Sequence, residues 1–263
     1  MRKYNLLVAF VLMLALNNYY AYSVDNIKIA LSKGSGSSHY QNYYNWLKKA
    51  DPKIEIIDMY SIDPKNIMKE LATCNGILFT GGDDIAPGRF GKAADSVRCE
   101  IDYKRDTLEF ALFETALKLK IPILGICRGE QLITVATGGS LIVDIPQDVK
   151  NPDKHQCELS DTCYHHIKIE SSSLLNKICG VTEGFVTTNH HQAALKISPR
   201  FVASSHGIDG VAESIERRNN KNNSFLLGVQ WHHEKMKFED PCSGNIAKYF
   251  IEEVKKYAAS KKR

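Results

Sequence analysis

Residues 121–139 read IPILGICRGEQLITVATGG, and this stretch decides the fold. Its first part, 121–126, is a short apolar run of the kind found in strands that are buried on both faces of a sheet. The apolar positions between Glu130 and Thr137 predict a helix directly afterwards. Cys127 stands at the turn between the two elements. A buried strand that leads into a helix is the repeating unit of parallel α/β folds.

The position of Cys127 indicates chemistry. A residue at the start of a helix lies beside free N–H groups and the positive end of the helix dipole. That environment favours the thiolate, which is the nucleophilic form of cysteine. Gly125 and Gly129 flank the turn, and residues without a Cβ allow a sharp bend and the close approach of a substrate. The alternative is a buried structural cysteine, because free cysteines are often buried.

The composition favours a single globular domain. The chain has 263 residues, of which 43% are hydrophobic, and this is enough for one large α/β domain. The formal net charge of +4 is spread along the chain, apart from a basic tail at 255–263 that we interpret as a solvated helix end. No basic stripe is interleaved with aromatic residues, so we expect no nucleic-acid partner. Without repeats or long linkers, residues 24–263 are predicted to form one domain.

The first 23 residues have the pattern of a secretory signal peptide. Arg2-Lys3 precedes the apolar run Leu6–Leu16, and Ala21-Tyr22-Ser23 provides the small residues of a cleavage site. The apolar run is too short to span a bilayer, which requires roughly 20 residues. We therefore predict export to a periplasmic or extracellular space and no membrane contact after cleavage. The alternative is an uncleaved anchor.

Export would place the chain in an oxidising compartment, where disulfides persist. The chain has seven cysteines. If Cys127 stays reduced, six remain, and the sequence does not select among their pairings. Cys157 and Cys163 enclose a short polar loop and are the best single candidate pair.

The rest of the chain predicts an α/β fold with a mostly parallel, doubly wound sheet, helices on both faces and appended antiparallel strands. In the first half, predicted strands at 27–31, 54–59 and 76–80 alternate with predicted helices at 38–47, 66–71 and 103–120. Ser37 or Ser38 is the expected cap of the first helix. In the second half, short strands are predicted at 167–169, 186–188, 201–205, 211–215 and 225–230, before a helix at 241–258.

Two further segments fit a cysteine nucleophile. His232 and Glu234 follow the last predicted strand, and residues two apart in an extended segment point to the same side. Glu234 can thus hold the imidazole in one tautomer while the other ring nitrogen faces Cys127. Gly81-Gly82 follows an earlier strand and leaves backbone N–H groups exposed. One of these, with the N–H of Arg128, could hold an oxyanion.

Five motifs resemble those of the class I glutamine-amidotransferase-like hydrolases, specifically the γ-glutamyl-γ-aminobutyrate hydrolase type (peptidase family C26). In chain order they are Gly81–Pro87 with Phe90-Gly91, Arg105-Asp106-x-x-Glu109, Gly125–Gln131 followed by Ala136–Gly139, His190–Ala193, and Gly228–Glu234. The resemblance covers nearly all of the chain after residue 23. It implies the flavodoxin-like fold of class I glutamine amidotransferases, and it is more specific for the family than for the substrate.

The resemblance also implies roles for individual residues. Cys127 would be the nucleophile, His232 the base and then the acid, and Glu234 the residue that orients the imidazole. Gly82 and Arg128 would supply backbone oxyanion donors, Gln131 would lie near the bound glutamyl group, and His191 would be close to the substrate. Two departures stand out: His233 replaces the usual proline, which would loosen the turn, and Thr187-Thr188 replace the usual Asn-Ser.

The implied reaction is acyl transfer on a small γ-glutamyl amide. The thiolate attacks the γ-carbonyl, His232 protonates the leaving amine, and water then releases glutamate from a γ-glutamyl thioester. Such an enzyme needs no cofactor. A homodimer is a possible assembly.

Other groupings of polar residues receive simpler interpretations. His155, Cys157, Cys163, His165 and His166 include zinc-ligand types, but their spacing matches no standard finger, so we assign no metal site. Asp83-Asp84 is interpreted as a turn that bonds its own backbone.

Alternative functions are a hydrolase of folyl or other poly-γ-glutamates, or a non-enzymatic or ammonia-supplying module. A module without activity would be expected to lack one of Cys127, His232 or Glu234, and a partner that uses ATP is hard to reconcile with export.

Overall fold

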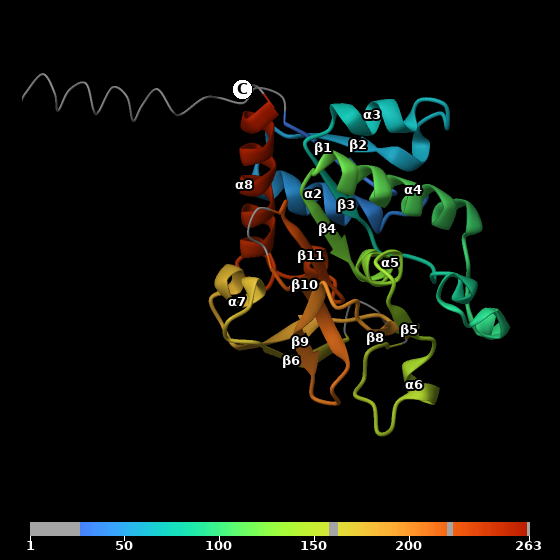
Figure 1. Ribbon diagram of the computed structural model, residues 1–263. Coiled ribbons are helices and arrows are strands. Elements are labelled where there is room, and N and C mark those ends of the chain that lie inside the picture. The colour runs from blue at the N-terminus through green and yellow to red at the C-terminus, as the bar shows by residue number, and fades with distance from the viewer. Residues whose placement is uncertain (1–26, 158–162, 220–222, 262–263) are drawn as a thin grey trace, which may run out of the picture.

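The computed structural model describes residues 27–157, 163–219 and 223–261 (Figure 1). The predicted signal peptide, 1–23, lies outside these ranges. Within them, none of the helices combines the length and the apolar character needed to cross a bilayer.

Nine of the described strands form one sheet, and five of them make up its parallel part. These five follow the order β2-β1-β3-β4-β11 across the sheet. Their bounds are β1 (Lys28–Leu31), β2 (Glu55–Asp58), β3 (Gly76–Phe79), β4 (Ile123–Ile126) and β11 (Leu226–Val229). The central strands β3, β4 and β11 are buried along their whole length, which explains their continuous apolar sequences.

The sheet continues beyond β11 with four antiparallel strands in the order β10-β9-β6-β7. Their bounds are β6 (Tyr164–Ile169), β7 (Glu183–Thr187), β9 (Phe201–Gly207) and β10 (Ala212–Arg217). The predicted fold, a mostly parallel sheet with appended antiparallel strands, is therefore confirmed. The sequence analysis missed β5 (Ser140–Ile142) and β8 (Ala193–Lys196), which pair with each other outside the main sheet. Such short strands carry little periodic signal.

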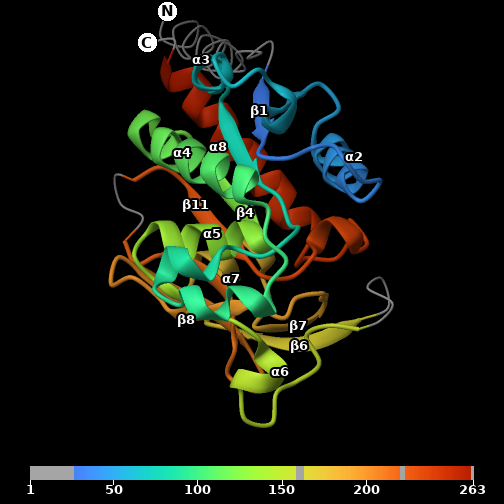
Figure 2. The same ribbon diagram turned by 90° about the vertical axis from the view of Figure 1, so that its right-hand side faces the viewer.

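Helices cover both faces of the sheet, as Figures 1 and 2 show. One face packs against α2 (Tyr40–Ala50), α7 (Leu174–Cys179) and α8 (Gly244–Lys261), which contribute Trp46, Leu175 and Phe250 to one hydrophobic core. The other face packs against α3 (Ile67–Thr73), α4 (Tyr103–Leu119) and α5 (Arg128–Ala136) around a second core. The central strands β3, β4 and β11 are therefore closed to solvent on both faces, as in a doubly wound sheet.

The shorter helical elements lie in the connections. They are α6 (Ile145–Asp148) and the 3₁₀ turns η1 (Met59–Ser61), η2 (Pro87–Phe90), η3 (Ala93–Arg98) and η5 (His233–Lys235). The predicted serine cap of α2 is wrong. His39 holds the cap position without a side-chain capping bond, and Ser37 Oγ instead accepts the His39 N–H at 3.3 Å.

Candidate active site

Cys127 lies between β4 and α5, at the turn that the sequence predicts. Its backbone has φ 52° and ψ −109°, a left-handed conformation that non-glycine residues rarely adopt. The Cys127 N–H donates to the Val229 carbonyl at 2.8 Å, so the neighbouring strand β11 holds the strained turn. Strain of this kind persists only where the surrounding structure enforces it, and it concentrates at functional sites.

The flanking glycines serve packing between the helix and the strands. A Cβ at Gly129 would lie 2.2 Å from the Phe79 carbonyl oxygen of β3, and one at Gly125 would lie 2.6 Å from the Gly129 carbonyl. Both residues must therefore lack a side chain for α5 to rest on β3 and β4. This corrects the sequence-based explanation, which assigned them to the turn and to substrate approach. The unusual φ belongs to Cys127 itself.

His232 and Glu234 follow β11, the strand that pairs in parallel with β4, so their segment meets Cys127 at the same edge. The His232 N–H donates to the Thr187 carbonyl at 2.8 Å, and His232 Nδ1 lies 2.8 Å from Glu234 Oε1. A Cβ at Gly81 would contact both His232 Cε1, at 3.0 Å, and Cys127 Cβ, at 3.5 Å. The three predicted residues therefore converge on one point.

The electrostatics of this group favour a charged imidazole. Burial opposes the imidazolium form of His232, but the negative charges of Glu234 and Cys127, with hydrogen bonds to both side chains, outweigh it. The net effect raises the pKa of His232 to about 10. Burial also opposes the carboxylate of Glu234, but its attraction to His232 lowers the pKa of that carboxyl.

The backbone N–H groups of Gly82 and Arg128 are the candidate oxyanion donors near Cys127. The Gly81 N–H donates to the Tyr43 hydroxyl at 3.0 Å, whereas among the described residues no hydrogen bond takes up the N–H of Gly82. Gly82 has φ +143°, which suits glycine alone. The Arg128 N–H is the first of α5 and has no partner within the helix. Gly82 borders the same cavities as Cys127, and its N–H and that of Arg128 are available to a ligand there.

A buried ion-pair network fixes both of these backbone segments. The side chains of Arg105, Asp106, Glu109 and Arg128 are almost fully buried, and each arginine pairs with a carboxylate. Arg105 also donates to the carbonyl oxygens of Thr80 and Gly81, at 2.8 and 2.9 Å. The network therefore joins the Gly81-Gly82 loop to the first turn of α5. Removing one member would leave a buried charge without its partner.

Cys127 opens onto cavities on two sides. One, of about 410 Å³, is lined by Gly82, Cys127, Gln131 and His191, and also by Asp84, Arg98, Glu100, Gln156 and Asn189. The other, of about 300 Å³, is lined by residues that include Tyr40, Tyr43, His232, Glu234 and Lys235. Cys127 and Gly82 border both cavities, so a substrate can lie across the sulfur.

The two predicted substrate contacts line the larger cavity. Gln131 donates from Nε2 to the Gln192 carbonyl at 3.0 Å, which orients its side chain. The imidazole of His191 lies between Asp84, at 2.9 Å, and Asp144, at 3.2 Å. The hydrogen bond to Asp84 is the main reason that the pKa of His191 is raised, although burial opposes the charge.

Asp84 is a cavity residue that the sequence analysis misassigned. Its carboxylate accepts from the Glu100 N–H at 2.9 Å and contacts His191, so it bonds distant segments rather than its own turn. Arg98, Glu100 and Asn189 also line the cavity without having been predicted. Asp84 is the aspartate of the first family motif, which was the available signal.

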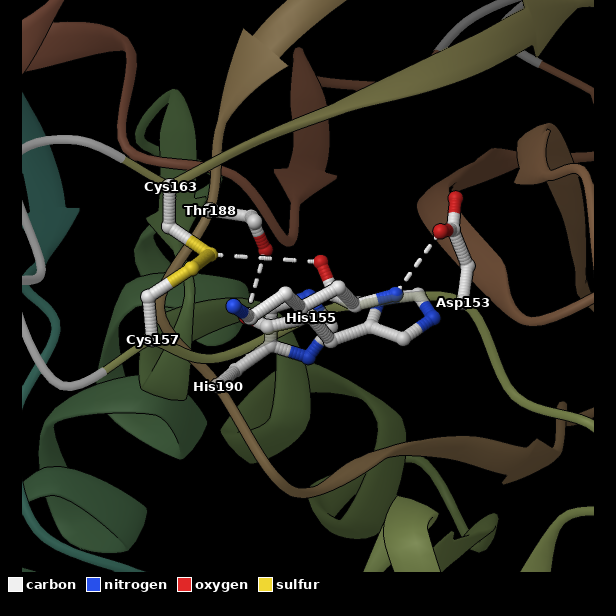
Figure 3. Close-up of a disulfide and its surroundings, with 7 residues drawn as sticks. Asp153, His155, Cys157, Cys163, Thr188 and His190 are labelled. Carbon is white, nitrogen blue, oxygen red and sulfur yellow. Dashed lines mark hydrogen bonds between the residues drawn. A yellow bond between two sulfur atoms is a disulfide. The ribbon is translucent and has the colours of Figure 1, made fainter.

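The predicted disulfide between Cys157 and Cys163 is confirmed. It removes both thiols from the grouping of possible zinc ligands around them. His166 Nε2 lies 3.3 Å from Glu183, on the opposite side of β6 from His165. The five-residue grouping considered at first is therefore divided. Figure 3 shows the disulfide beside His155 and His190.

Comparisons with known proteins show the family of the chain. A family model described as Peptidase C26 matches residues 27–234. The gamma-glutamyl-gamma-aminobutyrate hydrolase PuuD of Escherichia coli (strain K12) is 31% identical over 212 residues, which cover 76% of this chain and 80% of the relative. Protein NtpR of Enterococcus hirae is 29% identical and covers 81% of this chain and 88% of its own length.

Solved structures show the same fold. The glutaminase domain of Trypanosoma brucei CTPS, solved with bound acivicin, superposes with a TM-score of 0.63. The match covers 88% of this chain and 94% of that domain at 16% identity, so it shows the fold alone. The family model covers most of the chain and, with the relatives, identifies a glutamine amidotransferase-like hydrolase: the chain belongs to the Peptidase C26 family.

Proposed function

We propose that the protein is an exported cysteine hydrolase that cleaves the γ-glutamyl amide bond of small γ-glutamyl compounds. The observation that carries the proposal is the convergence of Cys127, His232 and Glu234 beside the free N–H groups of Gly82 and Arg128. These are the nucleophile, the acid–base group with its orienting carboxylate, and the oxyanion donors that acyl transfer requires.

The reaction proceeds in two steps. The Cys127 sulfur bonds to the γ-carbonyl carbon, and the N–H groups of Gly82 and Arg128 bind the oxyanion. The C–N bond breaks when the His232 imidazolium protonates the leaving amine, which yields a γ-glutamyl thioester. Neutral His232 then takes a proton from water, and the hydroxide displaces the sulfur to release glutamate. Every proton moves through His232, so no cofactor enters the scheme.

The lining of the larger cavity supports a glutamyl substrate. Glu100 offers a carboxylate to an α-ammonium group, with Asp84 adding negative charge beside it, and Gln131 offers hydrogen bonds. Arg98 adds positive charge for an α-carboxylate, although its guanidinium also bonds Asp95 and Asp148. The smaller cavity, bounded by Tyr40 and Tyr43, is then left for the leaving amine. The similarity to a gamma-glutamyl-gamma-aminobutyrate hydrolase supports the same substrate class.

Two observations support export. The first 23 residues have the signal-peptide pattern described above. The Cys157–Cys163 disulfide fits an oxidising compartment, because such bonds are rare where thiols are kept reduced.

A substrate screen with a nucleophile variant tests the activity. Cys127→Ala should lower glutamate release from γ-glutamyl-γ-aminobutyrate by a factor on the order of 10³ or more, with an unchanged circular dichroism spectrum. Cys74→Ala is the matched control, because it removes a buried thiol remote from the site and should remain active.

In the same screen, small γ-glutamyl amides should be cleaved faster than poly-γ-glutamates. A preference for poly-γ-glutamates would favour the folyl hydrolase alternative. Full activity in Cys127→Ala, or cleavage of α-glutamyl amides alone, would overturn the proposal.

A further inference from the structure

A second group of polar side chains lies beside the substrate cavity and is not used in the proposed reaction. His155 precedes the disulfide, His165 lies on β6, His190 follows β7, and Glu213 lies on β10. All four side chains are buried, and one ligand atom from each lies within 4.8 Å of the others. We call these residues the histidine cluster. Figure 3 shows two of its members, His155 and His190, beside the Cys157–Cys163 disulfide.

The distances within the cluster match a tetrahedral metal site. His155 Nδ1 lies 3.3 Å from His190 Nε2 and 3.2 Å from Glu213 Oε1, and the third side of this triangle is 3.5 Å. An ion about 2.1 Å from each of four tetrahedral ligands separates those ligands by about 3.4 Å. His165 Nε2, which lies 3.3 Å from the other oxygen of Glu213, is placed to complete the set.

Hydrogen bonds outside the cluster determine which ring nitrogens point into it. His155 Nε2 lies 2.9 Å from the Asp209 carboxylate, and His190 Nδ1 lies 2.9 Å from the Gln192 carbonyl oxygen. Both partners only accept hydrogen bonds, so both of these nitrogens carry hydrogen. In neutral rings the opposite nitrogens then present lone pairs, and these face each other and the carboxylate of Glu213.

A cation at its centre would stabilise such an arrangement. His155 Nδ1 and His190 Nε2 lie within hydrogen-bond distance, at 3.3 Å, but in neutral rings neither nitrogen carries a hydrogen, so their lone pairs and the Glu213 carboxylate repel one another. Among the described residues, neither ring nitrogen of His165 nor either oxygen of Glu213 has a hydrogen bond of acceptable geometry. Buried polar atoms are normally satisfied, so a set of unsatisfied atoms at one point requires an explanation. A metal ion provides one, and the hydrogen bonds of His155 and His190 to oxygen atoms are those that metal-bound histidines usually make.

We propose that His155, His165, His190 and Glu213 bind one Zn²⁺ ion in a closed structural site. Three imidazoles and one carboxylate in a compact tetrahedral arrangement suit zinc, whereas Ca²⁺ and Mg²⁺ require more oxygen ligands. All four positions are filled by protein, which is the pattern of structural rather than catalytic zinc. The ion would join β6 and β10 to two loops. One of these loops carries Asn189 and His191, so zinc would stiffen the wall of the substrate cavity.

Metal content in the full chain carrying Cys127→Ala tests the proposal, because that background removes the catalytic thiol as a competing ligand. After loading with Zn²⁺ and dialysis, mass spectrometry of the metal should find about one zinc per chain. Chelation should then lower Tm, as expected when a ligand bound only to the folded state is removed. Loading with Co²⁺ should give visible absorption bands characteristic of tetrahedral coordination.

Single substitutions locate the ion. Glu213→Gln should lose zinc at least tenfold, and Asp209→Asn should weaken binding by about 10–100-fold, because it removes the negative charge of the outer partner of His155 while leaving an acceptor oxygen. His166→Ala is the matched control, since it changes a histidine on the same strand that points the other way, and its zinc content should not change.

Zinc retained in Glu213→Gln would place the ion elsewhere, and no zinc in the Cys127→Ala parent would show that a proton occupies the cluster; either result overturns the proposal. If Glu213→Gln fails to fold, the metal content and the cobalt spectrum of the Cys127→Ala parent still test the proposal.

Discussion

At the residue scale, the proposed reactivity depends on two negative charges that share one imidazole. Glu234 and Cys127 both raise the pKa of His232, to about 10, against the cost of burial. An unfolded histidine has a pKa of about 6.5, so the folded state binds this proton more tightly. The stabilisation is complete below pH about 6.5 and is lost as pH rises through about 10.

Glu234→Gln should move the alkaline limit of activity to lower pH. In the proposed reaction the imidazolium of His232 protonates the leaving amine, so activity should fall when this group deprotonates. Removing the charge of Glu234 should lower that pKa by about 1–3 units. The measurement is kcat/KM for a γ-glutamyl amide between pH 6 and 11. An unchanged alkaline limb in the variant would show that His232 does not set it.

His233 is the departure from the family motif that the structure explains in part. The sequence predicted a looser turn, but the ring is fully buried and packs against Trp46, with centroids 4.2 Å apart. Burial lowers the pKa of His233 to about 3. The unfolded state therefore binds a proton from about pH 6.5 downward while the folded state does not, so acid favours unfolding.

His233→Pro should reduce this sensitivity to acid. The residue is the first of η5, a position that accommodates proline. Near pH 7 the Tm of the variant should lie within a few degrees of the original, because the loss of the Trp46 contact opposes the gain from a stiffer chain. Between pH 6.5 and pH 4 the Tm of the original protein should fall further than the Tm of the variant. Parallel Tm curves over that range would rule out a contribution from His233.

At the element scale, the junction of β4 and α5 could be predicted from residues 121–139, whereas its packing could not. The continuous apolar run at 121–126 located the strand, and the spacing of apolar positions after it located the helix, to within a few residues. The reason for Gly125 and Gly129 appeared only when β3 was placed against the helix, because the atoms that exclude a Cβ belong to Phe79 and to Gly129 itself.

Gly129→Ala should destabilise the fold by about 1–3 kcal/mol, because its Cβ would meet a backbone oxygen that cannot move away freely. Gly88→Ala is the control. A Cβ there would meet only Ala93, at 3.8 Å, and the expected change is within about 0.5 kcal/mol. Urea unfolding measures both. Equal stability of the two variants would contradict the packing explanation.

At the scale of the whole molecule, the sheet order brings the site together. β11 lies beside β4 in the sheet, and the antiparallel strands β10, β9, β6 and β7 lie on the other side of β11. The substrate cavity therefore combines the parallel half, which contributes Gly82 and Cys127, with the loop after β7, which contributes His190 and His191. The Cys157–Cys163 disulfide lies next to His155 (Figure 3), and the Thr188 N–H at the start of this loop donates to the Cys163 carbonyl at 2.9 Å.

Replacing both Cys157 and Cys163 by serine should lower the free energy of unfolding by about 2 kcal/mol, as expected for a disulfide that closes a short loop. Thermal unfolding with and without dithiothreitol measures the effect. The reductant should lower the Tm of the original protein but not that of the double variant. An equal loss in both would assign the effect to something other than this disulfide.

The sequence by itself determined the α/β class, the position of Cys127, the proposed nucleophile, at a strand–helix turn and the pairing of His232 with Glu234. These features depend on local periodicity and on residues close together in the chain. Only the tertiary structure decided the partners of Asp84, the pairing of β5 with β8 and the meeting of His155, His165, His190 and Glu213. Each of these contacts joins segments that are far apart in the chain, and the sheet order that brings such segments together leaves no periodic trace in the sequence.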